Sequence, residues 1–203
     1  MSQDIINFTL DGETVTAKAG ESIWQVAKRM GETIPHLCYK PEPGYRADGN
    51  CRVCMVEIEG ERVLAPSCLR PPTEGMVVTS ATSDRAQVSR KMVLELLATD
   101  QPEREESPDK SSHFWAMADL LAVDATEARF DETIKPCADN SSKAMRVNLQ
   151  SCINCNLCVV ACREVQVNDV IGMANRGSDS KVVFDFDDPM GDSTCVTCGE
   201  CVQ

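Results

Sequence analysis

Twelve cysteines in a chain of 203 residues are the feature that most constrains its fold. Cysteines at this density indicate disulfides, zinc sites or iron–sulfur clusters. Met1–Asp11 lacks the basic and apolar regions of a secretory signal, and no apolar run reaches the roughly 20 residues that a membrane span needs. We therefore expect a cytoplasmic chain without a membrane span. Cytoplasmic thiols stay reduced, so the pattern favours metal binding over disulfides.

The N-terminal cysteines have the spacing of a [2Fe–2S] site. Such a cluster needs two thiolates from one tight turn and two from flanking segments. The loop after the first cysteine is rich in Pro and Gly, and Gly44 and Gly49 allow the backbone to approach the sulfurs. A tetrahedral zinc site is the alternative, because Cys-x2-Cys pairs also hold zinc. The predicted ligands are Cys38, Cys51, Cys54 and Cys68.

The C-terminal cysteines repeat a different spacing. Cys152-x2-Cys155-x2-Cys158-x3-Cys162 is the run found in bacterial two-cluster ferredoxins. Cys195-x2-Cys198-x2-Cys201 begins a second copy. In that pattern the fourth cysteine of each run ligates the cluster of the other run. One [4Fe–4S] cluster is therefore predicted on Cys162, Cys195, Cys198 and Cys201.

The other [4Fe–4S] cluster is predicted on Cys152, Cys155 and Cys158. The crossed pattern requires its fourth thiolate three residues after Cys201, which is two positions past Gln203. We therefore expect the chain to continue, with the second module cut short here. Cys137 fits neither run and is interpreted as a structural thiol.

Local patterns predict an α+β fold in three parts. Residues 1–80 form a β-grasp [2Fe–2S] domain, residues 81–146 a helical linker, and residues 147–203 a ferredoxin-like module for two [4Fe–4S] clusters. The first domain is predicted from two hairpins, an intervening helix that begins at Ser22 and ends at Gly31, and a last strand. The predicted strands are Ile5–Leu10, Thr14–Ala17, Val53–Ile58, Arg62–Pro66 and Met76–Thr79.

The linker is predicted to contain two helices. The first covers residues 82–98, is capped by Thr82 or Ser83, and carries an apolar stripe. The second covers His113–Val123. The polar stretch Thr133–Met145 is the predicted domain boundary. The stripe comprises Val88, Met92, Leu96 and Leu97.

The charge of the chain limits its partners. A formal net charge of −12 argues against nucleic acid, because phosphate binding needs a basic surface. Four cations lie close in sequence to the first cysteine set. The default interpretation is solvated surface charge, and the alternative is that they offset part of a cluster's charge. They are Lys40, Arg46, Arg52 and Arg70. No catalytic constellation of His, Ser and Asp or of paired carboxylates is apparent. The sequence thus predicts electron transfer without a catalytic centre of its own.

Three stretches resemble known oxidoreductase subunits. They are Ile34–Cys38 with Gly49–Glu57, then Cys162–Met173, and finally Lys181–Gly191. The first resembles the [2Fe–2S] domain at the start of the large iron–sulfur subunit of respiratory complex I, which also occurs in NAD-reducing hydrogenases and NAD-dependent formate dehydrogenases. The other two are similar to the N-terminal part of the alpha subunit of cytosolic, molybdenum- or tungsten-dependent formate dehydrogenases.

This resemblance implies a role inside a larger enzyme. Formate would be oxidised at a molybdenum or tungsten bis-pterin cofactor in a downstream domain. The chain would pass the electrons through its clusters to a flavin- and NAD-binding iron–sulfur subunit, which reduces NAD⁺. No residue of a formate site can be assigned within these 203 residues.

This chain differs from the complex I subunits in one cysteine motif. Complex I subunits carry a His-x3-Cys-x2-Cys-x5-Cys site after the linking helix, whereas Leu96–Ala122 contains His113 and no cysteine. We therefore expect no cluster between the two modules, which favours the formate dehydrogenase interpretation. The alternatives are a diaphorase-type subunit of an NAD-reducing hydrogenase or complex I-like enzyme, and a zinc-stabilised interaction or regulatory protein.

Overall fold

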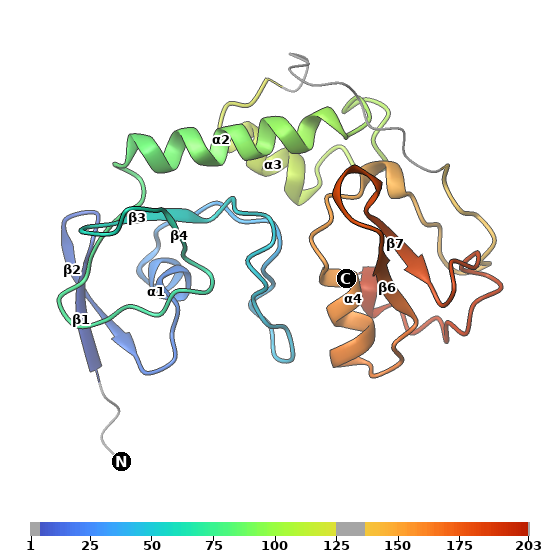
Figure 1. Cartoon of the computed structure of the whole chain (residues 1–203), viewed down its shortest axis with the longest axis horizontal. Coiled ribbons are helices and arrows are strands. Elements are labelled where there is room, and N and C mark those ends of the chain that lie inside the picture. The colour runs from blue at the N-terminus through green and yellow to red at the C-terminus, as the bar shows by residue number, and fades with distance from the viewer. Residues whose placement is uncertain (1–4, 125–136, 203) are drawn as a thin grey trace.

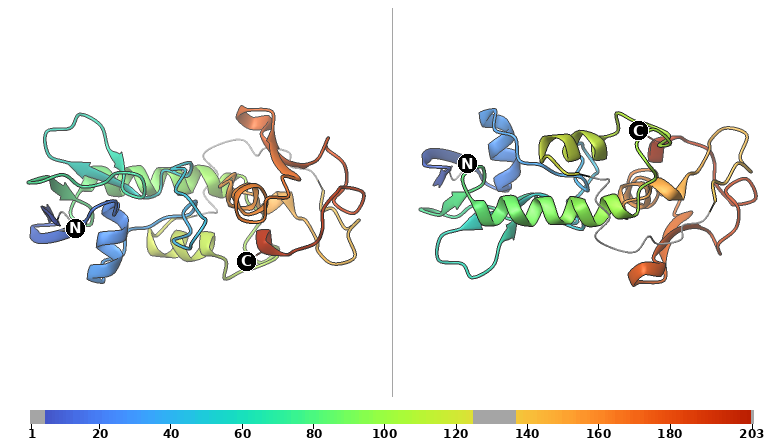
Figure 2. Two further views of the ribbon diagram at one scale, coloured as in Figure 1. Left: turned by 90° about the horizontal axis from the view of Figure 1, so that it is seen from below. Right: turned by 90° about the horizontal axis from the view of Figure 1, so that it is seen from above.

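The computed structural model describes residues 5–124 and 137–202. They form two lobes, with a long helix lying across the top of the molecule (Figure 1). We call residues 5–80 the N-terminal lobe and residues 137–202 the C-terminal lobe. Figure 2 shows that the two helices of the linker lie side by side, and the longer of them runs over the N-terminal lobe toward the C-terminal lobe (Figure 1).

The N-terminal lobe is built on a five-stranded mixed sheet with strand order β2-β1-β5-β3-β4. Strands β1 and β5 pair in parallel at its centre, and an antiparallel neighbour follows on either side. This order, with a helix after the first hairpin, is the predicted β-grasp arrangement and confirms an α+β fold. The strands are β1 (Ile5–Leu10), β2 (Glu13–Lys18), β3 (Met55–Ile58), β4 (Ala65–Pro66) and β5 (Val77–Thr79).

The strand predicted at Arg62–Pro66 is wrong in length, since β4 keeps only its last two residues. Pro66 has no N–H to continue the ladder, and β4 is an edge strand, where proline is tolerated. The next residue then turns inward: the Ser67 N–H and hydroxyl both donate to the Cys54 carbonyl, at 3.1 and 2.8 Å. The short strand therefore leads the chain directly to Cys68.

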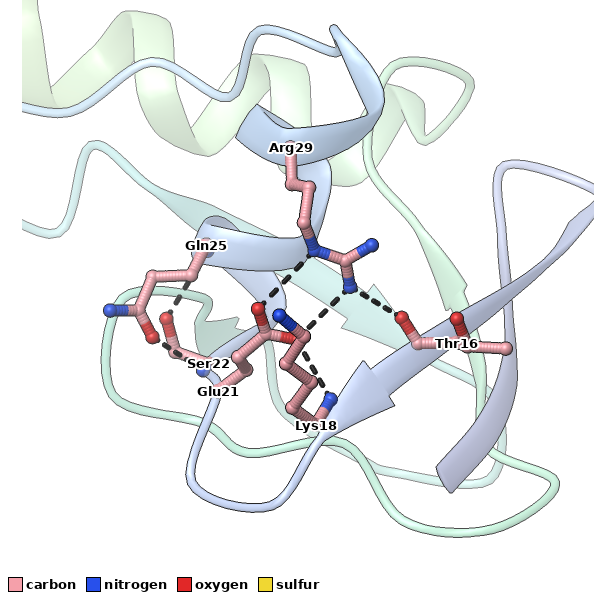
Figure 3. A network of polar contacts seen from close by, with 6 residues as sticks. All are labelled: Thr16, Lys18, Glu21, Ser22, Gln25 and Arg29. Carbon is pink, nitrogen blue, oxygen red and sulfur yellow. Dashed lines mark hydrogen bonds and ion pairs between the residues drawn. The ribbon is translucent and has the colours of Figure 1, made fainter. Parts of the chain in front are cut away.

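Helix α1 (Ile23–Met30) begins and ends where the sequence predicts. Ser22 and Gln25 form a capping box, in which each side chain accepts a hydrogen bond from the backbone N–H of the other (Figure 3). Gly31 ends the helix at φ 88°, a left-handed conformation that costs glycine nothing. Arg29 donates to Glu21 and to the Thr16 carbonyl, which ties the last turn to β2 (Figure 3).

Helix α2 (Asp84–Thr99) is capped by Ser83, whose hydroxyl accepts from the Ala86 N–H. Its predicted apolar stripe is wrong. Three of the four stripe residues are about half exposed, at 58% for Val88, 51% for Met92 and 48% for Leu96. The face that packs on the sheet is instead formed by Ala86, Arg90, Leu94 and Ala98.

Arg90 explains why the predicted stripe faces outward. This charged residue lies outside the predicted stripe. Its side chain is 2% exposed, and its guanidinium donates to backbone carbonyls at the edge of the sheet. This pins one side of the helix to β3 and turns the residues of the predicted stripe outward. Helix α3 (His113–Leu120) follows, shorter than predicted, and packs on α2 through Phe114, Trp115 and Ala118.

The C-terminal lobe combines a two-stranded sheet with short helical turns. Strands β6 (Ile171–Ala174) and β7 (Lys181–Phe184) form an antiparallel hairpin. Helix α4 (Leu157–Val160) continues into a π-helical turn, η2 (Ala161–Val165). Three 3₁₀ turns complete the lobe: η1 (Leu149–Ser151), η3 (Gly177–Asp179) and η4 (Glu200–Val202). The core holds Val159, Cys162, Val170, Ile171, Val182, Phe184 and Met190.

Part of the predicted boundary at Thr133–Met145 packs against this lobe. Asp139 forms a β-bridge with Val147, and its carboxylate accepts from the Met190 N–H at 2.7 Å. The Gly191 N–H donates to Ser141 Oγ at 2.8 Å. Residues 133–136 of that stretch lie outside the described residues. Residues 139–141 are therefore held directly by the segment before the last three cysteines.

One loop of the N-terminal lobe makes polar contacts with the C-terminal lobe. This loop, residues 39–50, hangs between the two lobes (Figure 1). The Tyr45 hydroxyl donates to Glu200 at 2.8 Å, and the Asn156 amide donates to Asp48 at 3.0 Å. Arg46 forms an ion pair with Glu164 at 2.7 Å. The loop between the first two cysteines therefore joins the lobes.

Candidate iron–sulfur sites

The four N-terminal cysteines come together at one end of the β-grasp sheet. Cys38 and Cys51 lie at the two ends of the interlobe loop, Cys54 immediately precedes β3, and Cys68 follows β4. All four side chains are buried. The fold thus converts four distant sequence positions into a shielded thiol cluster.

Within this cluster the thiols form two pairs. The Cys38 thiol donates to Cys51, which lowers the pKa of Cys51, and the Cys68 thiol donates to Cys54, which lowers the pKa of Cys54. The charges of the two pairs also influence one another. Thiolates are the form that binds iron, so one cysteine of each pair is prepared for ligation.

Backbone N–H groups point at these sulfurs. The Cys51 N–H donates to Cys38 Sγ at 3.3 Å, and the Val53 N–H donates to Cys51 Sγ at 3.5 Å. Arg52, at φ 57°, makes the turn that presents them. Gly49 is required nearby, because a Cβ there would lie 2.4 Å from Leu69 Cδ1. Such N–H bonds orient sulfur ligands and stabilise their negative charge.

The last three cysteines surround a cavity together with Cys162. The cavity has about 290 Å³ of empty space, part of it open to solvent, and its other walls are largely apolar. The Val170 N–H donates to Cys162 Sγ at 3.4 Å, and the Asn168 amide lies 3.9 Å from Cys198 Sγ. The four lining thiols are those of Cys162, Cys195, Cys198 and Cys201.

The two C-terminal runs have the same backbone although they share few residues besides cysteine. In each run the second and fourth residues after the first cysteine are left-handed, at φ 52° and 71° for Asn154 and Asn156, and 55° and 82° for Thr197 and Gly199. In each run the second residue donates its N–H to the first sulfur at 3.4 Å. A β-branched residue such as Thr197 rarely adopts this conformation, and such strain is concentrated at functional sites.

Cys152, Cys155 and Cys158 lie between the other two sets. Burial raises the pKa of Cys158 to about 12, and the neighbouring Cys155, Cys152 and Cys201 thiolates add to the shift. Burial also raises the pKa of Cys155, with contributions from Cys152 and Cys51. Cys155 packs against the apolar cluster that contains Cys38 and Cys51. The three sets of thiols are therefore contiguous, and no signal in the sequence indicates their order in space.

The remaining candidates lie apart from these sets. Cys137 is exposed. His36 and His113 contact each other edge to face, with ring centroids 4.8 Å apart. Within residues 5–124 and 137–202, no group of three or more His, Cys, Asp or Glu side chains is arranged to hold a single metal ion. No helix in that part of the chain is long and apolar enough to cross a membrane.

The N-terminal lobe is similar to a known domain family. Residues 3–83 match the model of the 2Fe-2S iron-sulfur cluster binding domain. A chain in the crystal structure of an NAD⁺-reducing [NiFe]-hydrogenase in the H₂-reduced state is similar with a TM-score of 0.81 and 27% identity, over 94% of this chain and 80% of that chain.

Curated relatives extend the likeness to nearly the whole chain. An NADP-reducing hydrogenase subunit of Solidesulfovibrio fructosivorans is 34% identical over 98% of this chain and 34% of its own length. A subunit of an NADH-quinone oxidoreductase of Rhizobium meliloti is 30% identical over 98% of this chain and 23% of its own. A putative formate dehydrogenase of Staphylococcus haemolyticus is 26% identical over 98% of this chain and 20% of its own. This chain thus spans about a third or less of the length of these relatives.

Proposed function

We propose that this chain is a one-electron relay inside an NAD-linked oxidoreductase. The observation that carries the proposal is the contiguity of three thiol sets, which include every cysteine except Cys137. Iron–sulfur clusters, when bound, supply one-electron transfer at potentials that depend on their surroundings. The residues of this chain would hold, orient and shield the clusters.

The N-terminal thiols are the proposed ligands of a [2Fe–2S] cluster. Their donor set fits that group, because four buried thiols arranged as two pairs can supply two ligands to each of two irons. The match of residues 3–83 to a 2Fe-2S domain supports iron over zinc. The proposed ligands are Cys38, Cys51, Cys54 and Cys68.

The C-terminal thiols are the proposed ligands of two [4Fe–4S] clusters. Cys162, Cys195, Cys198 and Cys201 ring one cavity, as a four-thiolate site requires. Cys152, Cys155 and Cys158 would hold the other cluster, with the fourth ligand still predicted two positions past Gln203. The matching left-handed backbones of the two runs support this duplicated assignment.

Contiguous ligand sets are what a relay needs. The charge of Cys51 affects Cys155, and the charge of Cys201 affects Cys158. The middle set, Cys152 to Cys158, therefore adjoins both of the others. A relay through these residues would run from the β-grasp lobe to the cavity lined by Cys162, or in the reverse direction.

Formate is the electron donor that we propose, by the resemblance of Cys162–Met173 and Lys181–Gly191 to formate dehydrogenases, with one relative of that name in support. The flavin- and NAD-binding subunit and a molybdenum or tungsten pterin domain would be its partners. Hydrogen is the second candidate, because relatives named as hydrogenases reach 34% identity over the chain and a TM-score of 0.81.

The donor can be tested in the native complex. NAD⁺ reduction is measured with formate and with H₂ as the separate electron sources, in enzyme isolated with its partner subunits. Formate-dependent reduction with bound molybdenum or tungsten supports the first candidate. Reduction with H₂ alone would replace it with the second.

Replacing Cys54 with Ser tests the relay itself. We expect the chain to lose about two irons and two sulfides, the content of one [2Fe–2S] cluster, while it keeps its other iron. Cys137→Ser is the matched control, since that thiol is exposed and outside every set, and it should leave the iron content unchanged. A wild-type chain that holds stoichiometric zinc without sulfide would overturn the proposal.

A further inference from the structure

The buried residues of the described chain include a single charged side chain, that of Arg90 on α2. It is 2% exposed and lies between the helix and the β-grasp sheet. A buried charge costs several kcal/mol unless an opposite charge or a good set of hydrogen-bond partners compensates for it. Its surroundings must therefore supply that compensation.

Hydrogen bonds to neutral oxygens supply part of the compensation for this buried charge. Nε donates to the Met55 carbonyl at 2.9 Å, while the two terminal nitrogens donate to the Ser80 carbonyl at 3.3 Å and to Ser80 Oγ at 2.8 Å. Within the described residues, no carboxylate lies within ion-pair distance of the guanidinium. The positive charge is held in place but is not neutralised by these contacts.

One of these hydrogen bonds leads toward the first cysteine set. Met55, which accepts from Nε, directly follows Cys54 in the chain. Burial lowers the pKa of Arg90, and the charges of Cys54 and then Asp11 oppose this shift. Asp11 is itself hydrogen-bonded to the backbone N–H groups of Ser80 and Ala81. Of these two groups, Cys54 therefore has the larger electrostatic effect on the guanidinium.

Other cations near the first cysteine set are placed differently. Lys40, Arg46 and Arg70 each form an ion pair with a carboxylate at the surface. Such pairs contribute little net field, and solvent screens them further. These three residues therefore differ from Arg90, whose charge is buried and has no carboxylate partner within the described residues.

We infer that Arg90 is a positioning residue that supplies a fixed positive charge to the [2Fe–2S] site and raises its reduction potential. This rests on the proposed ligation by Cys38, Cys51, Cys54 and Cys68. Reduction adds one negative charge to the cluster, so a nearby cation stabilises the reduced form more than the oxidised form. Burial keeps that effect from being screened.

The test is the midpoint potential of the [2Fe–2S] signal, followed by electron paramagnetic resonance during titration of the full chain with dithionite. Arg90→Met should change the oxidised-to-reduced ratio of the cluster at a given potential by at least tenfold. For a one-electron couple this is a shift of the midpoint by 59 mV to more negative potential. Arg90→Lys keeps the charge and should restore most of the shift. Lys91→Met, which removes a charge from the neighbouring exposed position, should leave the midpoint unchanged.

Each outcome decides the matter. Equal shifts in Arg90→Lys and Arg90→Met, or none in Arg90→Met, would overturn the inference while leaving the cluster in place. If neutral variants fail to assemble the cluster, Asp11→Asn must raise the midpoint more than Glu13→Gln does, and equal effects would overturn it. The absence of any [2Fe–2S] signal from the wild-type chain would instead overturn the proposed function.

Discussion

His36 makes the stability of the N-terminal lobe depend on pH. Its ring packs edge to face against Trp24 at 4.5 Å and against His113 at 4.8 Å. Burial lowers its pKa from 6.5 to about 4, and His113 and then Lys28 add to the shift, against a backbone hydrogen bond at Ile34. The folded state therefore holds this side chain neutral while the unfolded chain would protonate it.

The pH dependence follows from that difference. Below pH 6.5 the unfolded chain binds a proton at His36 that the folded state does not. The free energy of unfolding is therefore highest above pH 6.5 and falls as the pH falls toward 4. His36→Gln should therefore flatten the loss of thermal stability between pH 7 and pH 5, measured by calorimetry. His113→Gln, at an exposed ring, should flatten it less. An unchanged pH slope in His36→Gln would contradict this account.

At the level of elements, α2 has two different apolar faces. Leu94 is fully buried against the linker core, whereas Leu96, two residues later, is 48% exposed. Leu94→Ala should lower the free energy of unfolding by about 2–5 kcal/mol, the usual cost of a cavity in a core. Leu96→Ala should change it by less than about 0.5 kcal/mol. Denaturant unfolding measures both, and a larger loss for Leu96→Ala would restore the stripe predicted from sequence.

Two glycines of the C-terminal lobe differ in the space available for a side chain. A Cβ on Gly191 would lie 2.5 Å from the backbone of Ser141, whereas one on Gly172 would only touch Val183 at 3.9 Å. Gly191→Ala should therefore push residues 139–141 away and destabilise the lobe by about 1–3 kcal/mol. Gly172→Ala should be neutral or stabilising by up to about 1 kcal/mol. Equal melting temperatures for the two variants would show that the close approach at Ser141 is unimportant.

Local signals explain which elements the sequence could predict. Ser22 and Gly31 act within one helix, so they predicted α1 with correct ends, whereas the contribution of Gln25 to the cap appears only in the structure. The buried face of α2 depends on carbonyls at Met55 and Ser80, which no periodicity contains, so the apolar stripe was predicted on the wrong side.

The candidate sites divide in the same way. Spacing alone assigned Cys162 to the last three cysteines, which it joins around the cavity. The proximity of Cys51 and Cys155 could not be foreseen, because it depends on how the linker helices bring the two lobes together. The crossed association of the two C-terminal runs is therefore predictable, and their approach to the N-terminal cysteines is not.

For the whole molecule, the interlobe loop is the main polar connection. Tyr45 donates to Glu200, and burial followed by this hydrogen bond raises the pKa of Tyr45 to about 12. Tyr45→Phe should cost about 0.5–1.5 kcal/mol and speed amide hydrogen exchange in residues 39–50. Tyr39→Phe removes a hydroxyl from the start of the same loop, where the ring is buried in the N-terminal core and burial raises its pKa, and should leave the exchange around Tyr45 unchanged. Equal exchange in both variants would contradict a joining role.

The position of this loop also has a consequence for biosynthesis. Cys38, Cys51, Cys54 and Cys68 are translated well before Asn156 and Glu200, the residues that fasten the loop at Asp48 and Tyr45. At ribosomal rates of about 5–20 residues per second, that interval is on the order of 10 s. During it the nascent chain carries a complete thiol set under an unfastened loop. The proposed cluster can therefore be inserted at the first site before the C-terminal lobe has folded.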